Sequence, residues 1–159
     1  MSRREAREQA FILLFEKSFR PESMQEIIDL AVKSRELELE PFAAEAALHA
    51  VEHFEEFDAR IERLSTKWKM NRISKVAFAV LRLALYEMTY ENDIPVSVSI
   101  NEAVEVAKKY AGEDDSAFVN GVLGTAAKEL EAEQKAAAAG PVPEQTEVTE
   151  TPAPDKTEE

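Results

Sequence analysis

Three arginines stand within the first seven residues, and they are the first side chains of the chain that could bind an anion. Arg3 and Arg7 are four residues apart, so on a helix they project from the same side, with Arg4 beside them. Guanidinium groups in such a row suit the phosphates of a nucleic acid, because each presents a planar fork of N–H donors. The alternative is that Arg4 pairs with Glu8 while the other arginines are solvated, and composition alone leaves both interpretations open.

Two further groups of cations contain aromatic residues. The stretch KWKMNRISK, Lys67 to Lys75, has four cations, no acid and Trp68, and the pair Lys108 and Lys109 precedes Tyr110. Cations meet phosphates and aromatic faces stack on unpaired bases, so this mixture favours single-stranded nucleic acid as a ligand. For Trp68 we favour the core, because it continues the apolar face of the preceding helical pattern.

The string HAVEH, His49 to His53, matches the H-x-x-E-H arrangement of inverted zinc peptidases. Such enzymes need a third ligand, and no downstream carboxylate motif supplies one. The two imidazoles lie opposite the apolar stripe of the same predicted helix, which indicates that they face solvent. With no cysteine, no glycine-rich phosphate loop and no G-x-S-x-G motif, we predict neither a metal nor a cofactor, and no enzyme.

The net charge of −13 is unevenly distributed along the 159 residues. Residues 131–159 hold eight acids and two lysines, a balance of −6, which leaves −7 for residues 1–130. Residues 131–159 are rich in Pro, Thr, Ala and Glu and contain no aromatic residue, so we expect a disordered acidic tail after a folded domain of residues 1–130. No apolar run approaches the roughly 20 residues of a membrane span, and we expect a soluble, cytoplasmic protein.

Helical spacing of apolar residues predicts an all-α fold of about seven helices. Ser2 with Glu5, and Ser23 with Glu26, form capping boxes that begin the first two helices. The second helix should bury the face of Met24, Ile27, Ile28, Ala31 and Val32. A third helix is expected from Pro41, and a shorter fourth helix should hold Ile61 and Leu64 and end near Trp68. The last three are expected over 72–91, over 96–111 with a left-handed cap at Gly112, and from residue 114 or 115 onward.

Two residue patterns inside these helices need a structural explanation. Arg82 interrupts the most apolar helix, so it must find a carboxylate or helix-end carbonyls, or extend outward along its aliphatic stem. We favour a structural pair, with Glu87, Glu102 and Glu105 as candidates. Gly121 and Gly124 are three residues apart inside a helical pattern, and we interpret them as points of close helix packing.

The second half of the chain resembles the NusB family of bacterial transcription antitermination factors. The residues that carry the resemblance are LRLALYEM (Leu81–Met88) and IPVSVSINEAVEVAKKYAGEDDSAFVNGVLG (Ile94–Gly124), together with the arginine-rich opening from Arg3 to Ala10. The resemblance covers about residues 2–130. It implies two small helical bundles, no catalysis, and pairing with NusE, which is also a small-subunit ribosomal protein.

The same resemblance implies that the pair binds single-stranded boxA RNA and helps RNA polymerase, with other Nus factors, to transcribe through terminators, notably in ribosomal RNA operons. A NusB-like domain also occurs fused to RNA methyltransferases, for which this chain has no room. The resemblance assigns six residues to RNA binding: Arg3, Arg4, Arg7, Tyr110, Asp114 and Phe118.

One segment departs from the family. Members commonly carry charged residues just before L-R-x-A, and some use an acid there to meet NusE, whereas this chain has Ala77 and Phe78. We assign NusE binding to these two positions. A homodimer stays open as a further state, and two other functions stay open: a helical protein–protein adaptor without RNA affinity, and a metallohydrolase that uses His49 and His53.

Overall fold

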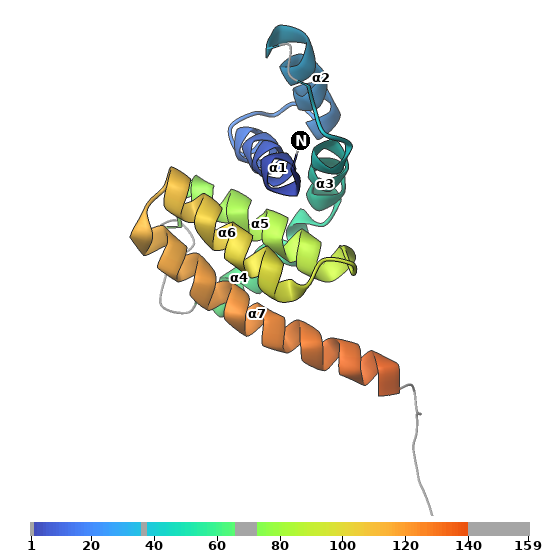
Figure 1. Cartoon of the computed structure of the whole chain (residues 1–159), viewed down its shortest axis with the longest axis vertical. Coiled ribbons are helices and arrows are strands. Elements are labelled where there is room, and N and C mark those ends of the chain that lie inside the picture. Colours follow the sequence, from blue (N-terminus) through green and yellow to red (C-terminus); the bar gives the residue numbers. More distant parts are fainter. Residues whose placement is uncertain (1, 36–37, 66–72, 140–159) are drawn as a thin grey trace, which may run out of the picture. The chain divides into compact units, whose positions relative to one another are not determined.

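The computed structural model describes residues 2–35, 38–65 and 73–139, and every regular element in these ranges is an α-helix (Figure 1). The chain divides into two units, Met1–Ala127 and Lys128–Glu159. The helices are α1 (Arg3–Lys17), α2 (Met24–Arg35), α3 (Pro41–Glu52), α4 (Phe54–Leu64), α5 (Lys75–Tyr90), α6 (Val96–Tyr110) and α7 (Glu113–Ala139). The all-α prediction is confirmed.

α1 and α2 begin where the sequence provides caps. The hydroxyl of Ser2 accepts a hydrogen bond from the backbone N–H of Glu5, whose carboxylate accepts one from the N–H of Ser2. Ser23 and Glu26 repeat this reciprocal pair ahead of α2. Such caps satisfy backbone donors that have no partner inside the helix, so they define the first turn of α1, on which Arg3 and Arg4 lie.

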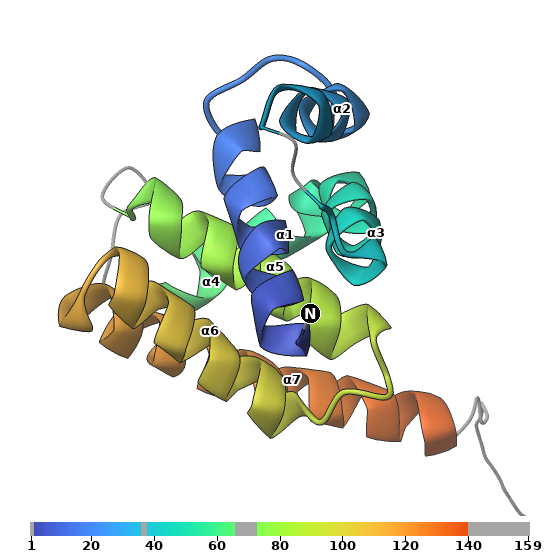
Figure 2. The same cartoon turned by 45° about the horizontal axis from the view of Figure 1, so that its top comes forward.

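The core of the first unit forms where α1 and α3 pack on α5 (Figure 2). α1 also packs on α2 and α3, and α5 packs on α4 and α6. The buried face of α3 consists of four alanines with no exposed surface, and because their side chains are short the neighbouring backbones can approach closely. These alanines are Ala43, Ala46, Ala47 and Ala50.

α5 is buried over most of its circumference, as its apolar sequence predicts. Ten of its residues are buried, among them Glu87, which is 1% exposed. A carboxylate in such a place needs a partner. This buried acid is the first indication that the arginines of α1 have a structural role.

Several expectations need correction. Val32 is 42% exposed and does not join the buried face of α2. A Cβ added at Gly121 or Gly124 would meet no atom within 4 Å, so these glycines do not mark close packing.

α7 continues to Ala139, past the expected start of the tail, and the remainder of that predicted tail, residues 140–159, lies outside the described residues. The described residues of the second unit, 128–139, are helical throughout. None of the described helices is both long enough and apolar enough to cross a membrane.

Candidate nucleic-acid interface

Arg3 and Arg4 extend from the first turn of α1 into solvent. The guanidinium carbon of Arg3 lies 4.2 Å from the centroid of the Phe42 ring, which is a cation–π contact. Both arginines line a surface hollow of about 450 Å³, together with Pro95 and Val98 from the start of α6. This hollow has room for a phosphate and part of its sugar.

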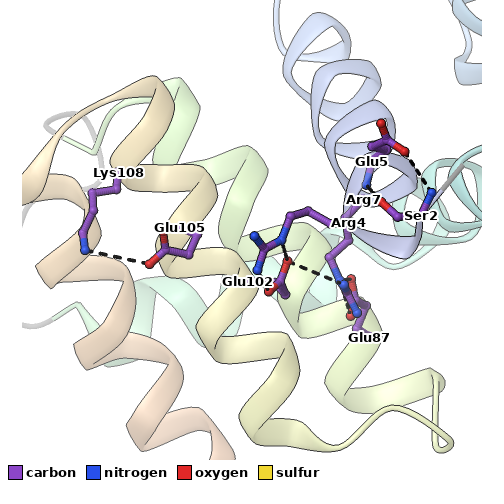
Figure 3. A network of polar contacts seen from close by, with 8 residues as sticks. All are labelled: Ser2, Arg4, Glu5, Arg7, Glu87, Glu102, Glu105 and Lys108. Carbon is purple, nitrogen blue, oxygen red and sulfur yellow. Dashed lines mark hydrogen bonds and ion pairs between the residues drawn. The ribbon is translucent and has the colours of Figure 1, made fainter.

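Arg4 is held by a carboxylate from α6. Its Nε and Nη2 atoms donate to the two oxygens of Glu102 at 2.9 and 2.7 Å (Figure 3). The side chain of Arg4 is 71% exposed, whereas that of Glu102 is 15% exposed. The hydrogen bonds from Arg4 hold the pKa of Glu102 below its ordinary value and raise the pKa of Arg4.

Arg7 differs from the prediction, because its guanidinium does not face solvent. The residue is 5% exposed, and its Nε donates to both oxygens of Glu87, at 3.0 and 2.8 Å. The hydroxyl of Ser99 donates to the same carboxylate at 2.9 Å. Nη1 of Arg7 lies 3.9 Å from Glu102, so Arg7 stands behind the Arg4–Glu102 pair and connects α1, α5 and α6 (Figure 3).

Tyr110 lies at the other end of α6 from this hollow and is 40% exposed. Its ring centroid is 4.9 Å from that of Phe11, and Nζ of Lys109 lies 5.3 Å from the Tyr110 centroid. Lys109 also donates to Glu8 of α1 at 2.5 Å. Desolvation raises the pKa of Tyr110, so at neutral pH it offers a neutral ring and a hydroxyl.

Asp114 and Phe118 occupy the first turns of α7, after the turn at Gly112, whose φ of 113° confirms the predicted left-handed cap. Asp114 is exposed and Phe118 is half-buried. The neighbouring Asp115 is engaged elsewhere, because it accepts a hydrogen bond from the hydroxyl of Ser74 at 2.6 Å. Asp114 therefore has the more accessible carboxylate of the two.

Ala77 and Phe78, the positions expected to bind a protein partner, differ in their exposure to solvent. Ala77 is 1% exposed, so its side chain does not offer a contact to another protein. Phe78 is half-buried and lines a second hollow of about 360 Å³, with Lys17 and Lys75 at its sides. Ala77 fills space under this surface, and Phe78 belongs to the surface itself.

Arg82 forms a wall of the second hollow and corrects another expectation. Its guanidinium donates to both oxygens of Asp58, at 2.9 and 2.7 Å, and not to Glu87, Glu102 or Glu105. It lies 4.0 Å from the Phe54 centroid and 5.2 Å from that of Phe78. Stacking and the bidentate pair together hold this arginine in place.

The two histidines do not share a helix, because α3 ends at Glu52 and His53 lies between α3 and α4 with φ of −118° and ψ of 19°. His49 is exposed as predicted, whereas His53 is half-buried against Tyr90, with ring centroids 4.4 Å apart. Within the described ranges, no three His, Asp or Glu side chains are grouped as metal ligands would be.

The basic stretch from Lys67 to Lys75 falls largely outside the described residues, since residues 66–72, Trp68 included, are not described. Its last lysine, Lys75, lies with Nζ 5.3 Å from the centroid of the exposed Phe19.

Sequence reasoning missed the anionic partners of the arginines. Glu102 is 98 residues from Arg4, and Glu87 is 80 residues from Arg7. The sequence contains a hint in Glu87 on the apolar helix α5 and in Glu102 on α6. The partner of each acid depends on how α1 crosses α5 and α6. Arg3 and Arg4 lie on α1, and Tyr110 lies on α6. Asp114 and Phe118 lie on α7, the helix that follows α6.

Comparison with known proteins gives consistent matches. The family model of the NusB family matches residues 4–128. The transcription antitermination protein NusB of Agathobacter rectalis is 43% identical over 127 residues, which are 77% of this chain and 97% of that protein.

Solved structures agree. NusB of T. maritima is similar with a TM-score of 0.70 and 38% identity, over 81% of this chain and 92% of that chain. A structure of the antitermination factors NusB and NusE in complex with double-stranded RNA gives a TM-score of 0.71 and 29% identity, over 80% of this chain and 96% of that chain.

Proposed function

Because the chain belongs to the NusB family, we propose that it is a transcription antitermination factor that binds single-stranded boxA RNA together with NusE. In this role it promotes transcription through terminators by RNA polymerase, notably in ribosomal RNA operons. The observation that carries the proposal is the pair of exposed arginines, Arg3 and Arg4, which line a hollow between α1 and α6. The chain is not an enzyme, in keeping with its family.

The chemistry of the surface suits an unpaired strand. Arg3 and Arg4 contact phosphates, which fixes the position of the strand without selecting its sequence. Tyr110 stacks on a base, and the carboxylate of Asp114 accepts a hydrogen bond from a base amino group. Phe118 adds apolar surface beside Asp114, and Arg7 supports the arginines from behind through Glu87 and Glu102.

NusE is the proposed protein partner, and the NusB–NusE–RNA complex among the similar structures supports it. On this chain we assign the contact to Phe78 and the hollow beside it, with buried Ala77 as its support. The assembly acts in the cytoplasm with RNA polymerase and other Nus factors. A homodimer of the free protein is the other assembly state left open by the sequence. Sedimentation velocity distinguishes this dimer from the monomer.

Fluorescence anisotropy tests the proposal with three labelled RNAs: a boxA-containing strand from the organism's ribosomal leader, a scrambled strand, and a duplex of the boxA strand. Each is titrated with the protein alone and with NusE present. We expect the boxA strand to bind most tightly, and more tightly with NusE. For the protein alone, the two exposed arginines should neutralise two phosphates. The slope of log affinity against log salt concentration should then be about −1.4.

Two outcomes contradict the proposal in different ways. Equal binding of boxA and scrambled strands, with or without NusE, leaves a protein that attracts RNA without recognising it. NusE binding without any RNA affinity indicates the protein–protein adaptor. Variants Arg3→Ala and Arg4→Ala should each weaken boxA binding, because each removes one phosphate contact.

A further inference from the structure

The cations of the proposed RNA surface are nearly all neutralised by carboxylates of the same chain. Arg4 pairs with Glu102, buried Arg7 with Glu87, and Lys109 with Glu8, while Lys108 lies 3.8 Å from Glu105. Arg3 lies over the ring of Phe42. The basic appearance of the sequence therefore overstates the charge available to RNA.

We propose that Glu102 is an internal competitor for the RNA phosphate at Arg4 and thereby limits the affinity of this surface for RNA. The inference rests on the proposed function, because it concerns the same arginine. It assigns to Glu102 a role beyond holding helices together: its carboxylate occupies the edge of Arg4 at which a phosphate binds best.

The geometry of the pair supports this competition. Glu102 takes Nε and Nη2 of Arg4, the edge with two parallel N–H bonds that also suits phosphate in bidentate contact. A phosphate must either displace the carboxylate or bind the remaining N–H groups beside it. If the phosphate displaces the carboxylate, the Arg4–Glu102 pair is lost. If the phosphate binds beside it, two anions share one guanidinium and repel each other.

The charge of Glu102 adds only modestly to the stability of the fold. Arg7, the buried cation of the network, is already paired with Glu87 at 2.8 Å and lies farther from Glu102, at 3.9 Å. Arg4 is exposed, and an exposed ion pair adds little to stability. The main consequence of the Glu102 charge is therefore electrostatic, at the surface of the hollow that Arg3 and Arg4 line.

Repulsion outweighs the benefit of holding Arg4 still. Two unit charges about 5 Å apart in water lower affinity roughly fourfold, and more where solvent is partly excluded. A bound phosphate would itself order the Arg4 side chain, so losing Glu102 as an anchor costs less than this. Removing the charge should strengthen RNA binding.

The test compares Glu102→Gln with Glu16→Gln, which removes the same charge from another arginine–carboxylate pair, that of Glu16 with Arg35. RNA affinity is measured by anisotropy for the boxA strand and the scrambled strand, with unfolding temperature by circular dichroism as the check on folding. We expect E102Q to bind both strands about three- to tenfold more tightly, because phosphate contact is independent of sequence. E16Q should change affinity by less than about twofold, because Glu16 lies in the last turn of α1, far from Arg3 and Arg4.

A double-variant cycle separates competition from a general charge effect. In an Arg4→Ala background, E102Q should no longer strengthen binding, because the guanidinium that both anions seek is gone. Unchanged or weaker binding by folded E102Q overturns the inference, as does an equal gain from E16Q. Loss of boxA selectivity in the unaltered protein would instead overturn the proposed function. In that case the role of Glu102 is still tested by comparing the affinities of E102Q and the unaltered protein for the scrambled strand.

Discussion

Arg7 and Arg4 are three residues apart on one helix but have different tasks. Arg7 is buried with Glu87, so removing either charge would leave the other buried without its partner. Arg4 is exposed and its pair with Glu102 is accessible to water. The same residue type thus serves the core at one position and the surface at the other, which spacing in the sequence does not distinguish.

Replacing Arg7 by Ala should lower the free energy of unfolding by about 3 kcal/mol or more, because the carboxylate of Glu87 is left buried without its cation. Replacing Arg4 by Ala should cost less than about 1 kcal/mol, as for other exposed pairs. Urea denaturation of both variants measures the difference. Equal costs would contradict the assignment of Arg7 to the core.

Stability should fall in acid through carboxylates whose pKa values are lowered in the folded state. Hydrogen bonds from Arg4 lower the pKa of Glu102, and the capping bond from the Ser2 N–H lowers that of Glu5, both below the ordinary 4.5. Each group therefore adds stability above pH 4.5, which is lost as the pH falls through the folded pKa. Urea denaturation from about pH 6 to about pH 3 should show this loss, and E102Q should reduce its slope; an unchanged slope would remove Glu102 from the account.

At the scale of the helices, the two capping boxes provide a matched pair. Ser2→Ala and Ser23→Ala should each lower the free energy of unfolding by about 1 kcal/mol, because each removes the same kind of cap. RNA affinity should fall only for S2A, since Arg3 and Arg4 lie in the turn that Ser2 caps. Anisotropy with the boxA strand provides the measurement. Equal loss in S23A would mean that stability, and not the α1 turn, sets RNA affinity.

The glycines around α7 should respond in opposite directions. Gly121 lies inside the helix with open space at its Cβ position, so Gly121→Ala should raise the free energy of unfolding by about 0.5–1 kcal/mol. Gly112 has φ of 113°, a conformation that alanine rarely adopts, so Gly112→Ala should lower it by about 1–2 kcal/mol. Thermal and urea unfolding of both variants test the pair. Destabilisation by G121A would restore the packing interpretation.

Most of the helices could be predicted from local sequence, since caps, Pro41 at a helix start and apolar periodicity act within a few residues. The end of α7 was missed because the alanine-rich run before Ala139 has high helix propensity, although its composition otherwise resembles a tail. The partners of Arg4, Arg7 and Arg82 could not be predicted in this way. They depend on helix crossings between residues far apart in the chain.

At the scale of the whole molecule, the formal charge of −13 gives little attraction for RNA, and the cations of α1 and α6 are largely paired within the chain. Charges beyond about 8 Å are screened at physiological salt, so a local guanidinium edge can still bind a phosphate. We therefore expect modest affinity for the protein alone and a strong dependence on NusE. Isothermal titration of RNA into the protein, with and without NusE, should show that dependence.

Transcription through a terminator tests the central claim most directly. A template that carries boxA upstream of a terminator is transcribed by RNA polymerase with the other Nus factors, NusE and this protein, and a template with scrambled boxA is the control. We predict that the protein increases full-length transcript only on the boxA template, and that the Arg3→Ala, Arg4→Ala double variant loses this increase. Equal full-length transcript from both templates, or full activity of the double variant, would contradict the account.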